Sequence, residues 1–142
     1  MTRDEIEILY AKQSGFLGMS GGISSDLRDI EKAADTGNED AINAVASYCY
    51  NIKKTIGAYT VAMGGLDAIA FAGGIGENSA AVRYKVCEGL AFLGVNLDTE
   101  TNENPPDDGI LSQPGSKVTV LRIFTNEEIV VARKAMDYLK KR

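Results

Sequence analysis

The sequence has no histidine and no tryptophan among its 142 residues, and it has only two cysteines. The absence of histidine removes the most common general base and the most common metal ligand of proteins. The two cysteines, Cys49 and Cys87, lack CxxC spacing, which argues against a structural zinc site and against a disulfide framework. We therefore predict that both cysteines are buried thiols in a reducing compartment.

A long uninterrupted apolar run is also lacking. The most apolar stretch, residues 58–76, contains Asp67 and five glycines, so it predicts a helix end, a turn and a strand rather than a membrane span. The acidic start of the chain is unlike a signal peptide. The net charge of -5 argues against a nucleic-acid surface, which needs clustered Lys and Arg. We expect a cytoplasmic protein without membrane or nucleic-acid partners.

The composition that remains is typical of a globular protein. Hydrophobic residues make up 44% and charged residues 25% of the sequence. A chain of this length is expected to form one domain, residues 1–142.

The first half of the sequence predicts three helices. Thr2 and Glu5 have capping-box spacing before a helix that runs to about residue 14. The glycine-rich residues 15–22 cannot continue that helix, and a second helix is expected from about residue 24 to Gly37. Residues 38–63 form the longest periodic stretch, which Gly64 ends. Its predicted apolar face comprises Ile42, Val45, Cys49, Ile52, Ile56, Tyr59 and Met63.

The second half predicts strands separated by helices. A buried strand at 66–71, a glycine loop at 73–78 and a helix suit an α/β sheet. A polar loop is expected at 102–108, and strands are expected at 110–112 and 118–123. Thr125 is expected to open a final helix. The apolar face predicted for that helix contains Ile129, Ala132, Met136 and Leu139.

The glycine loop at 73–78 has two interpretations. Glycines after a strand let the backbone approach a ligand closely, and the following helix offers free amides to an anion. The loop can also be a plain strand-to-helix turn in which Asn78 caps the helix. It is not a P-loop, since no Gly-Lys-Ser/Thr follows, and Ser79 stands where GxGxxG needs its last glycine.

Two further segments offer polar groups. In residues 24–29, Arg28 can stack on a purine and Asp26 can accept from a ribose, although Asp26 and Asp29 have the spacing of a helix cap, which the residues alone favour. In the second segment, Thr125 and Glu128 have capping-box spacing, which leaves Glu127 to stabilise the helix dipole or to bind Mg²⁺.

Arg83 and Lys85 are interpreted as solvated charges without a function.

Three places in the chain resemble the acetate kinase family. Residues 14–20 followed by 24–29 look like the segment that contacts the adenosine in that family. Residues 71–79, Phe-Ala-Gly-Gly-Ile-Gly-Glu-Asn-Ser, are similar to its second nucleotide motif, and residues 124–128 with the helix that contains Arg133 resemble its closing segment. The order and the spacing of all three agree with the family.

The resemblance implies a fold, a reaction and a set of site residues. The fold is the ribonuclease-H-like α/β domain of the acetate and sugar kinase, Hsp70 and actin superfamily, a mixed sheet with flanking helices. The reaction is the reversible conversion of ATP and acetate to ADP and acetyl phosphate, with Mg²⁺. The resemblance assigns the adenosine pocket to Asp26, Leu27 and Arg28, and the metal to Glu127. It assigns the ribose and phosphate side to Gly74, Ile75, Gly76, Glu77 and Asn78.

The resemblance also implies that a part of the enzyme is missing. Full-length acetate kinases have an N-terminal domain with the phosphate loops, the acetate pocket and the arginines and histidine that stabilise the transferred phosphoryl group. We expect residues 1–142 to be the C-terminal part, without catalytic residues of its own and inactive alone. Binding of acetate would need the N-terminal domain, and the full-length enzyme is expected to be a homodimer.

Three alternatives accompany this interpretation. A propionate or butyrate kinase would differ mostly in the missing half. A non-catalytic module for nucleotide binding or dimerisation would work only with a separate N-terminal half. A Rossmann-type dinucleotide binder is opposed by the missing third glycine and by the lack of an acidic residue on a following strand.

Overall fold

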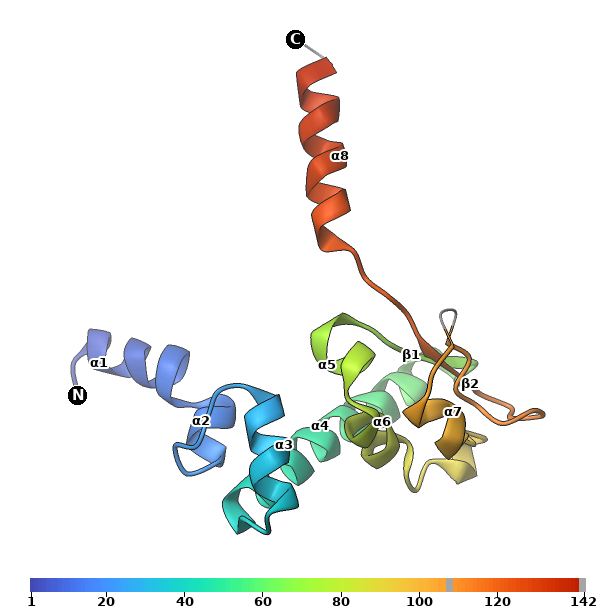
Figure 1. Cartoon of the computed structure of the whole chain (residues 1–142), viewed down its shortest axis with the longest axis horizontal. Helices are drawn as coiled ribbons and strands as arrows, with labels where there is room; N and C mark the ends of the chain where they lie inside the picture. The colour runs from blue at the N-terminus through green and yellow to red at the C-terminus, as the bar shows by residue number, and fades with distance from the viewer. Residues whose placement is uncertain (107–108, 141–142) are drawn as a thin grey trace.

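The computed structural model describes residues 1–106 and 109–140, with Glu127 described by its backbone alone (Figure 1). The first half of the chain is helical. Its elements are α1 (Arg3–Ile8), the π-helical turn η1 (Leu9–Gln13), α2 (Gly15–Met19), α3 (Leu27–Asp35) and α4 (Glu39–Met63). The second half alternates strands and short helices. Its elements are β1 (Ala68–Phe71), α5 (Gly73–Asn78), α6 (Ala80–Cys87), the 3-10 turn η2 (Ala91–Leu93), α7 (Thr99–Glu103), β2 (Thr119–Arg122) and α8 (Glu127–Lys140).

Local capping explains where the N-terminal helices begin and end. The predicted capping box at Thr2 is confirmed, because the Thr2 amide donates to Glu5 Oε2 over 2.7 Å and the Glu5 amide donates to Thr2 Oγ1. Asn38 caps α4 by accepting from the Ala41 amide over 2.9 Å. Gly64 ends α4 in the left-handed conformation (φ 74°), as expected for a helix-terminating glycine.

The sheet consists of β1 and β2, which pair in parallel from Ala68↔Thr119 to Phe71↔Arg122. Isolated β-bridges, both parallel and antiparallel, extend this sheet. Val95 pairs in parallel with Val118, and Ile110 pairs antiparallel with Leu121. The strand predicted at 110–112 is thus reduced to single bridges. Because the two strands are parallel, their carboxyl ends meet at one edge, where α5 and the segment leading to α8 leave the sheet (Figure 1).

The core lies between the sheet and helices α3, α4 and α6. Among the residues that the structure describes, sixteen apolar side chains are buried there, including Ile30, Val86, Val118 and Val120. The predicted face of α4 is only partly right: Val45 and Cys49 are buried, but Ile42, Tyr59 and Met63 are exposed, and the alanines at 41 and 44 complete the contact instead.

Both cysteines are free and buried, as predicted. Burial raises the pKa of the Cys87 thiol to about 11 and also raises the pKa of Cys49. Within residues 1–106 and 109–140, no helix has the length and apolar character needed to cross a membrane.

The prediction that Arg83 is a solvated charge is wrong. Arg83 is 2% exposed. Its Nε donates to Asn102 Oδ1 (2.8 Å) and its Nη2 to the Asn102 carbonyl (2.7 Å), while Nη1 donates to the carbonyls of Gly76 and Glu77. Asn102 is likewise buried, and α7 extends to Glu103, so the polar loop predicted at 102–108 begins at Asn104; residues 107–108 lie outside the described part.

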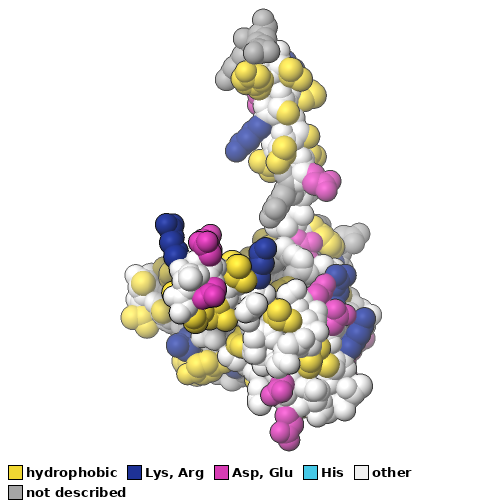
Figure 2. Space-filling view, turned by 90° about the vertical axis from the view of Figure 1, so that its left-hand side faces the viewer, with side chains coloured by type: hydrophobic (Ala, Val, Ile, Leu, Met, Phe, Trp, Pro, Cys, Tyr) yellow, Lys and Arg dark blue, Asp and Glu magenta, His cyan; other side chains and the backbone are white. Residues whose placement is uncertain are grey.

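The final helix projects away from the rest of the chain (Figure 1). Its apolar side chains are exposed, among them Ile129, Val131, Met136 and Leu139. Figure 2 shows hydrophobic side chains along this helix. The capping box predicted for Thr125 and Glu128 is wrong, because Asn126 Oδ1 accepts from the Ile129 amide (3.0 Å) and Thr125 donates elsewhere.

Candidate functional site

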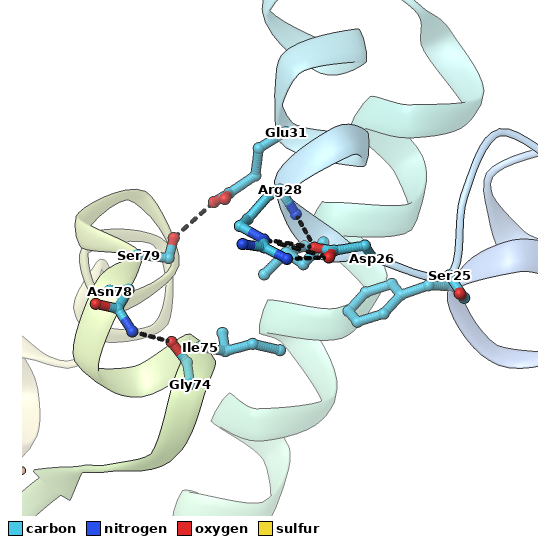
Figure 3. Close-up of a pocket in the computed structure, with 10 residues that line it drawn as sticks. Ser25, Asp26, Arg28, Glu31, Gly74, Ile75, Asn78 and Ser79 are labelled. Atoms are coloured by element: carbon cyan, nitrogen blue, oxygen red, sulfur yellow. Dashed lines mark hydrogen bonds and ion pairs between the residues drawn. The ribbon is translucent and has the colours of Figure 1, made fainter.

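A pocket of about 810 Å³ lies where the start of α3 faces α5 (Figure 3). Ligand sites commonly enclose about 300–1,000 Å³, so a nucleoside-sized molecule fits this volume. The lining joins residues far apart in sequence. It comprises Phe16, Ser25, Asp26, Leu27, Arg28, Glu31, Gly74, Ile75, Asn78 and Ser79.

On the α3 side, Asp26 and Arg28 form an ion pair at the helix start. The Asp26 carboxylate accepts from the Arg28 amide (2.9 Å) and from Arg28 Nε (3.0 Å), so Asp26 is the N-cap, as the capping interpretation predicted. Its expected partner Asp29 accepts instead from Ser24 Oγ. The Arg28 guanidinium lowers the pKa of Asp26 to about 2, so the contribution of this carboxylate to stability is lost only as the pH falls from about 4 toward 2.

Leu27 has a double role next to this pair. Its side chain is 5% exposed and belongs to the core, while it also lines the pocket. Phe16 of α2 stands nearby and packs against Tyr48 of α4, with the ring centroids 4.9 Å apart. These side chains give one side of the pocket an apolar surface on which a flat ring can lie.

On the other side, the glycine segment is a short helix rather than an open loop. It forms α5, and Asn78 closes it by donating from Nδ2 to the Gly74 carbonyl (2.8 Å). The prediction that Asn78 caps the following helix is wrong: Ser79 caps α6 by accepting from the Val82 amide (3.0 Å). The Gly73 amide at the start of α5 is not free, because it donates to Glu77 Oε1 (3.0 Å).

Six of the eight predicted nucleotide contacts line the pocket, and two do not. The six are Asp26, Leu27, Arg28, Gly74, Ile75 and Asn78. Gly76 faces the protein instead: a Cβ atom there would stand 3.1 Å from the carbonyl carbon of Phe71. Glu77 turns away from the pocket and binds Gly73 and Thr125.

Glu31 is a lining residue that the sequence did not suggest, and Ser79, the last residue of the motif at 71–79, lines the pocket without having been assigned a role. Ser79 Oγ donates to Glu31 Oε1 over 2.6 Å, which joins α3 to the start of α6 across the pocket wall. Glu31 follows Arg28 by three residues, and residues at this spacing share a helix face. That spacing was the available signal for Glu31.

Glu127 is the predicted metal ligand, and its side chain lies outside the described part of the chain. Its backbone begins α8, two residues after Thr125. Across the described residues, no group of three or more Asp, Glu, Cys or His side chains is arranged to hold a metal ion. Mg²⁺ usually takes one or two carboxylates together with waters and substrate phosphates, so a single carboxylate fits the chemistry of a nucleotide-borne Mg²⁺.

Chemically, the pocket offers an apolar surface with polar groups at its rim. Arg28 carries a planar cation, Asp26 and Glu31 carry hydrogen-bond acceptors, and Gly74 presents backbone without a side chain. A Cβ atom added to Gly74 would meet nothing within 4 Å, so its surroundings are open. A heterocycle with a polyhydroxylated or anionic tail suits this arrangement.

The comparisons with known proteins agree on one family. The profile described as the Acetokinase family matches residues 1–133. The acetate kinase of Coprothermobacter proteolyticus is 47% identical over 140 residues, which is 99% of this chain and 35% of that protein.

Solved structures agree with this result. The Porphyromonas gingivalis acetate kinase has a TM-score of 0.87 and 45% identity over 98% of this chain and 35% of its own. A propionate kinase from Francisella tularensis has a TM-score of 0.81 and 32% identity, over 93% of this chain and 33% of its own. The chain thus spans about a third of the length of its relatives, and the fold class predicted from the sequence is confirmed.

Proposed function

This chain belongs to the Acetokinase family, and from this premise we propose that it forms the C-terminal, nucleotide-binding part of an acetate kinase. The reaction would be the reversible transfer of a phosphoryl group from ATP to acetate. The observation that carries the proposal is the pocket between α3 and α5, which gathers six residues assigned to the nucleotide from two separate segments of the chain.

The lining suggests how adenosine would lie. The purine would rest on the apolar surface of Phe16, Leu27 and Ile75. Asp26 would accept hydrogen bonds from the ribose hydroxyls, and the guanidinium of Arg28 would stack on the base or bind oxygens. The backbone at Gly74 would lie next to the ribose or the phosphates, because no side chain keeps a ligand away there.

Glu127 would hold, on the protein side, a Mg²⁺ ion carried by the nucleotide phosphates. The bound ion would neutralise charge on the transferred phosphoryl group. Glu127 begins α8, and Thr125, two residues before it, is hydrogen-bonded to Glu77 of α5, the helix that also contains Gly74.

The complete reaction would need the rest of the relatives' length. Phosphoryl transfer depends on positioning and electrostatic stabilisation from several directions, and we assign no catalytic residue to residues 1–142. The acetate pocket, the choice between acetate and propionate, and homodimer formation would involve the remaining two-thirds. The apolar side chains of α8 are exposed, and we expect them to promote self-association of the isolated chain.

A reconstitution assay tests the proposed function. A relative's acetate kinase is truncated to remove the region that this chain matches, and the two pieces are mixed with ATP, Mg²⁺ and acetate. We expect neither piece alone to form acetyl phosphate and the mixture to form it, measured as the hydroxamate, with an acetate-free mixture as the control. Association of the two pieces without any acetyl phosphate would contradict the kinase proposal and favour a non-catalytic nucleotide-binding module.

A further inference from the structure

One carboxylate oxygen connects α5, on one side of the proposed nucleotide pocket, with the segment that leads to α8. Glu77 Oε1 accepts from the Gly73 amide (3.0 Å), from the Thr125 amide (2.9 Å) and from Thr125 Oγ1 (2.7 Å). Gly73 begins α5, whereas Thr125 lies 48 residues later in the segment that leads to α8. Three donors on a single oxygen occupy its accepting capacity, so this oxygen has no lone pair left for a metal or a ribose.

The position of this contact follows from the sheet. The Ile123 amide donates to the Phe71 carbonyl (2.8 Å), so the pairing of β1 and β2 continues to the last residue of β1. Beyond that point the two chains part, one into α5 and the other toward α8. Glu77 rejoins them at the carboxyl ends of the parallel strands, the edge at which open α/β sheets bind ligands.

The surroundings favour an ionised Glu77. Its pKa is lowered first by the hydroxyl of Thr125, then by the Thr125 amide, and further by the Gly73 amide and the charge of Arg122. A charged acceptor forms stronger hydrogen bonds than a neutral one. Thr125, in turn, precedes Asn126, whose side chain caps α8, and Glu127, where α8 begins.

We propose that Glu77 is a positioning residue. It fixes the start of α8, and with it Glu127, relative to α5, the helix that contains Gly74. The proposal rests on the proposed function, since it gives Glu77 the role of aligning α5, which lines the nucleotide pocket, with the predicted metal ligand Glu127. In this role Glu77 acts through Oε1, which contacts neither the nucleotide nor the metal, whereas the family resemblance assigned Glu77 to the ribose and phosphate side.

The first test is independent of any ligand. Amide hydrogen exchange of the whole chain is followed by NMR in the wild type, Glu77→Gln, Glu77→Ala and the control Glu88→Ala, whose side chain is exposed. We expect the Thr125 amide to exchange roughly tenfold faster or more in Glu77→Ala, as for the loss of a hydrogen bond to a charged acceptor, with a smaller effect in Glu77→Gln. Unchanged exchange at Thr125 would overturn the proposal.

The second test separates positioning from direct contact. ADP is titrated with and without Mg²⁺ into the wild type, Glu77→Gln, Thr125→Val and Thr125→Ser. We expect Thr125→Val to reduce the gain in affinity that Mg²⁺ gives, to leave the metal-free affinity within about twofold, and to be rescued by serine, which keeps the hydroxyl. An equal loss of affinity with and without Mg²⁺ in Glu77→Gln would show a ligand contact instead. If the wild type binds no ADP, the proposed function fails while the exchange result still decides whether Glu77 holds Thr125.

Discussion

Replacement of Arg83 by methionine is expected to lower the free energy of unfolding by about 3 kcal/mol, because each buried polar group left without a partner costs about 1–3 kcal/mol. The guanidinium serves four acceptors: the carbonyls of Gly76, Glu77 and Asn102, and the side-chain oxygen of Asn102. Methionine fills similar space but donates to none of them.

The removal of Arg83 has two opposing effects on the free energy of unfolding, because it leaves four acceptors without their donor but also removes a buried charge. Burial lowers the pKa of the guanidinium, and the nearby charge of Arg122 lowers it further. Among the described residues, no carboxylate oxygen lies within 4 Å of it, so methionine also removes an unbalanced buried charge. We expect the lost hydrogen bonds to dominate, since they join α6 to both α5 and α7.

Urea unfolding monitored by circular dichroism measures this prediction. Lys85→Met is the matched control, since Lys85 is an exposed cation on the same helix and should change stability by no more than about 0.5 kcal/mol. Equal stability of the two variants would show that the Arg83 network contributes little.

The substitution Gly76→Val is expected to destabilise the protein and to weaken ADP binding together. A Cβ atom at Gly76 would stand 3.1–3.3 Å from the backbone and Cβ of Phe71, so the branched side chain forces α5 away from the end of β1. Such overpacking costs about 1–3 kcal/mol, and a displaced α5 moves one whole side of the pocket. The cause is therefore a clash inside the protein rather than a clash with the ligand.

The substitution Gly74→Ala isolates the ligand contact. Gly74 lines the pocket, its φ is not positive, and an added Cβ meets nothing within 4 Å, so alanine should keep or raise the stability of α5. If the nucleotide lies against this backbone, ADP affinity should fall by roughly tenfold, since crowding a packed contact costs about 1–3 kcal/mol. Thermal unfolding and ADP titration of both glycine variants measure the pair. Loss of affinity in Gly76→Val with none in Gly74→Ala would place the ligand away from Gly74.

Local rules predicted most of the helices and both strands. The capping box at Thr2, the turn residue Gly64 and the strand before Gly73 depend on neighbours in sequence, so the sequence carries their signal. Asp26 and Gly74, which line opposite sides of the pocket, were assigned to the nucleotide by the family resemblance, and that assignment stays a prediction.

Contacts between distant segments were the source of two errors, at Arg83 and at Thr125. Arg83 was expected in solvent because the acceptors that allow its burial include Asn102, which lies 19 residues away. The capping box at Thr125 did not form: the amide and the hydroxyl of Thr125 both donate to Glu77, 48 residues earlier, and Asn126 caps the helix instead. A pattern of charges along the chain contains no information about partners that only the fold brings near.

The most direct test of the proposed nucleotide site is calorimetric titration of the 142-residue chain with ADP, with and without Mg²⁺. A preformed adenosine pocket predicts binding with a dissociation constant between micromolar and millimolar, that is, roughly 4–8 kcal/mol of binding free energy, and weaker binding in Gly74→Ala. Binding of ADP that Gly74→Ala leaves unchanged, or no heat of binding in a chain that NMR shows to be folded, would contradict a nucleotide site between α3 and α5.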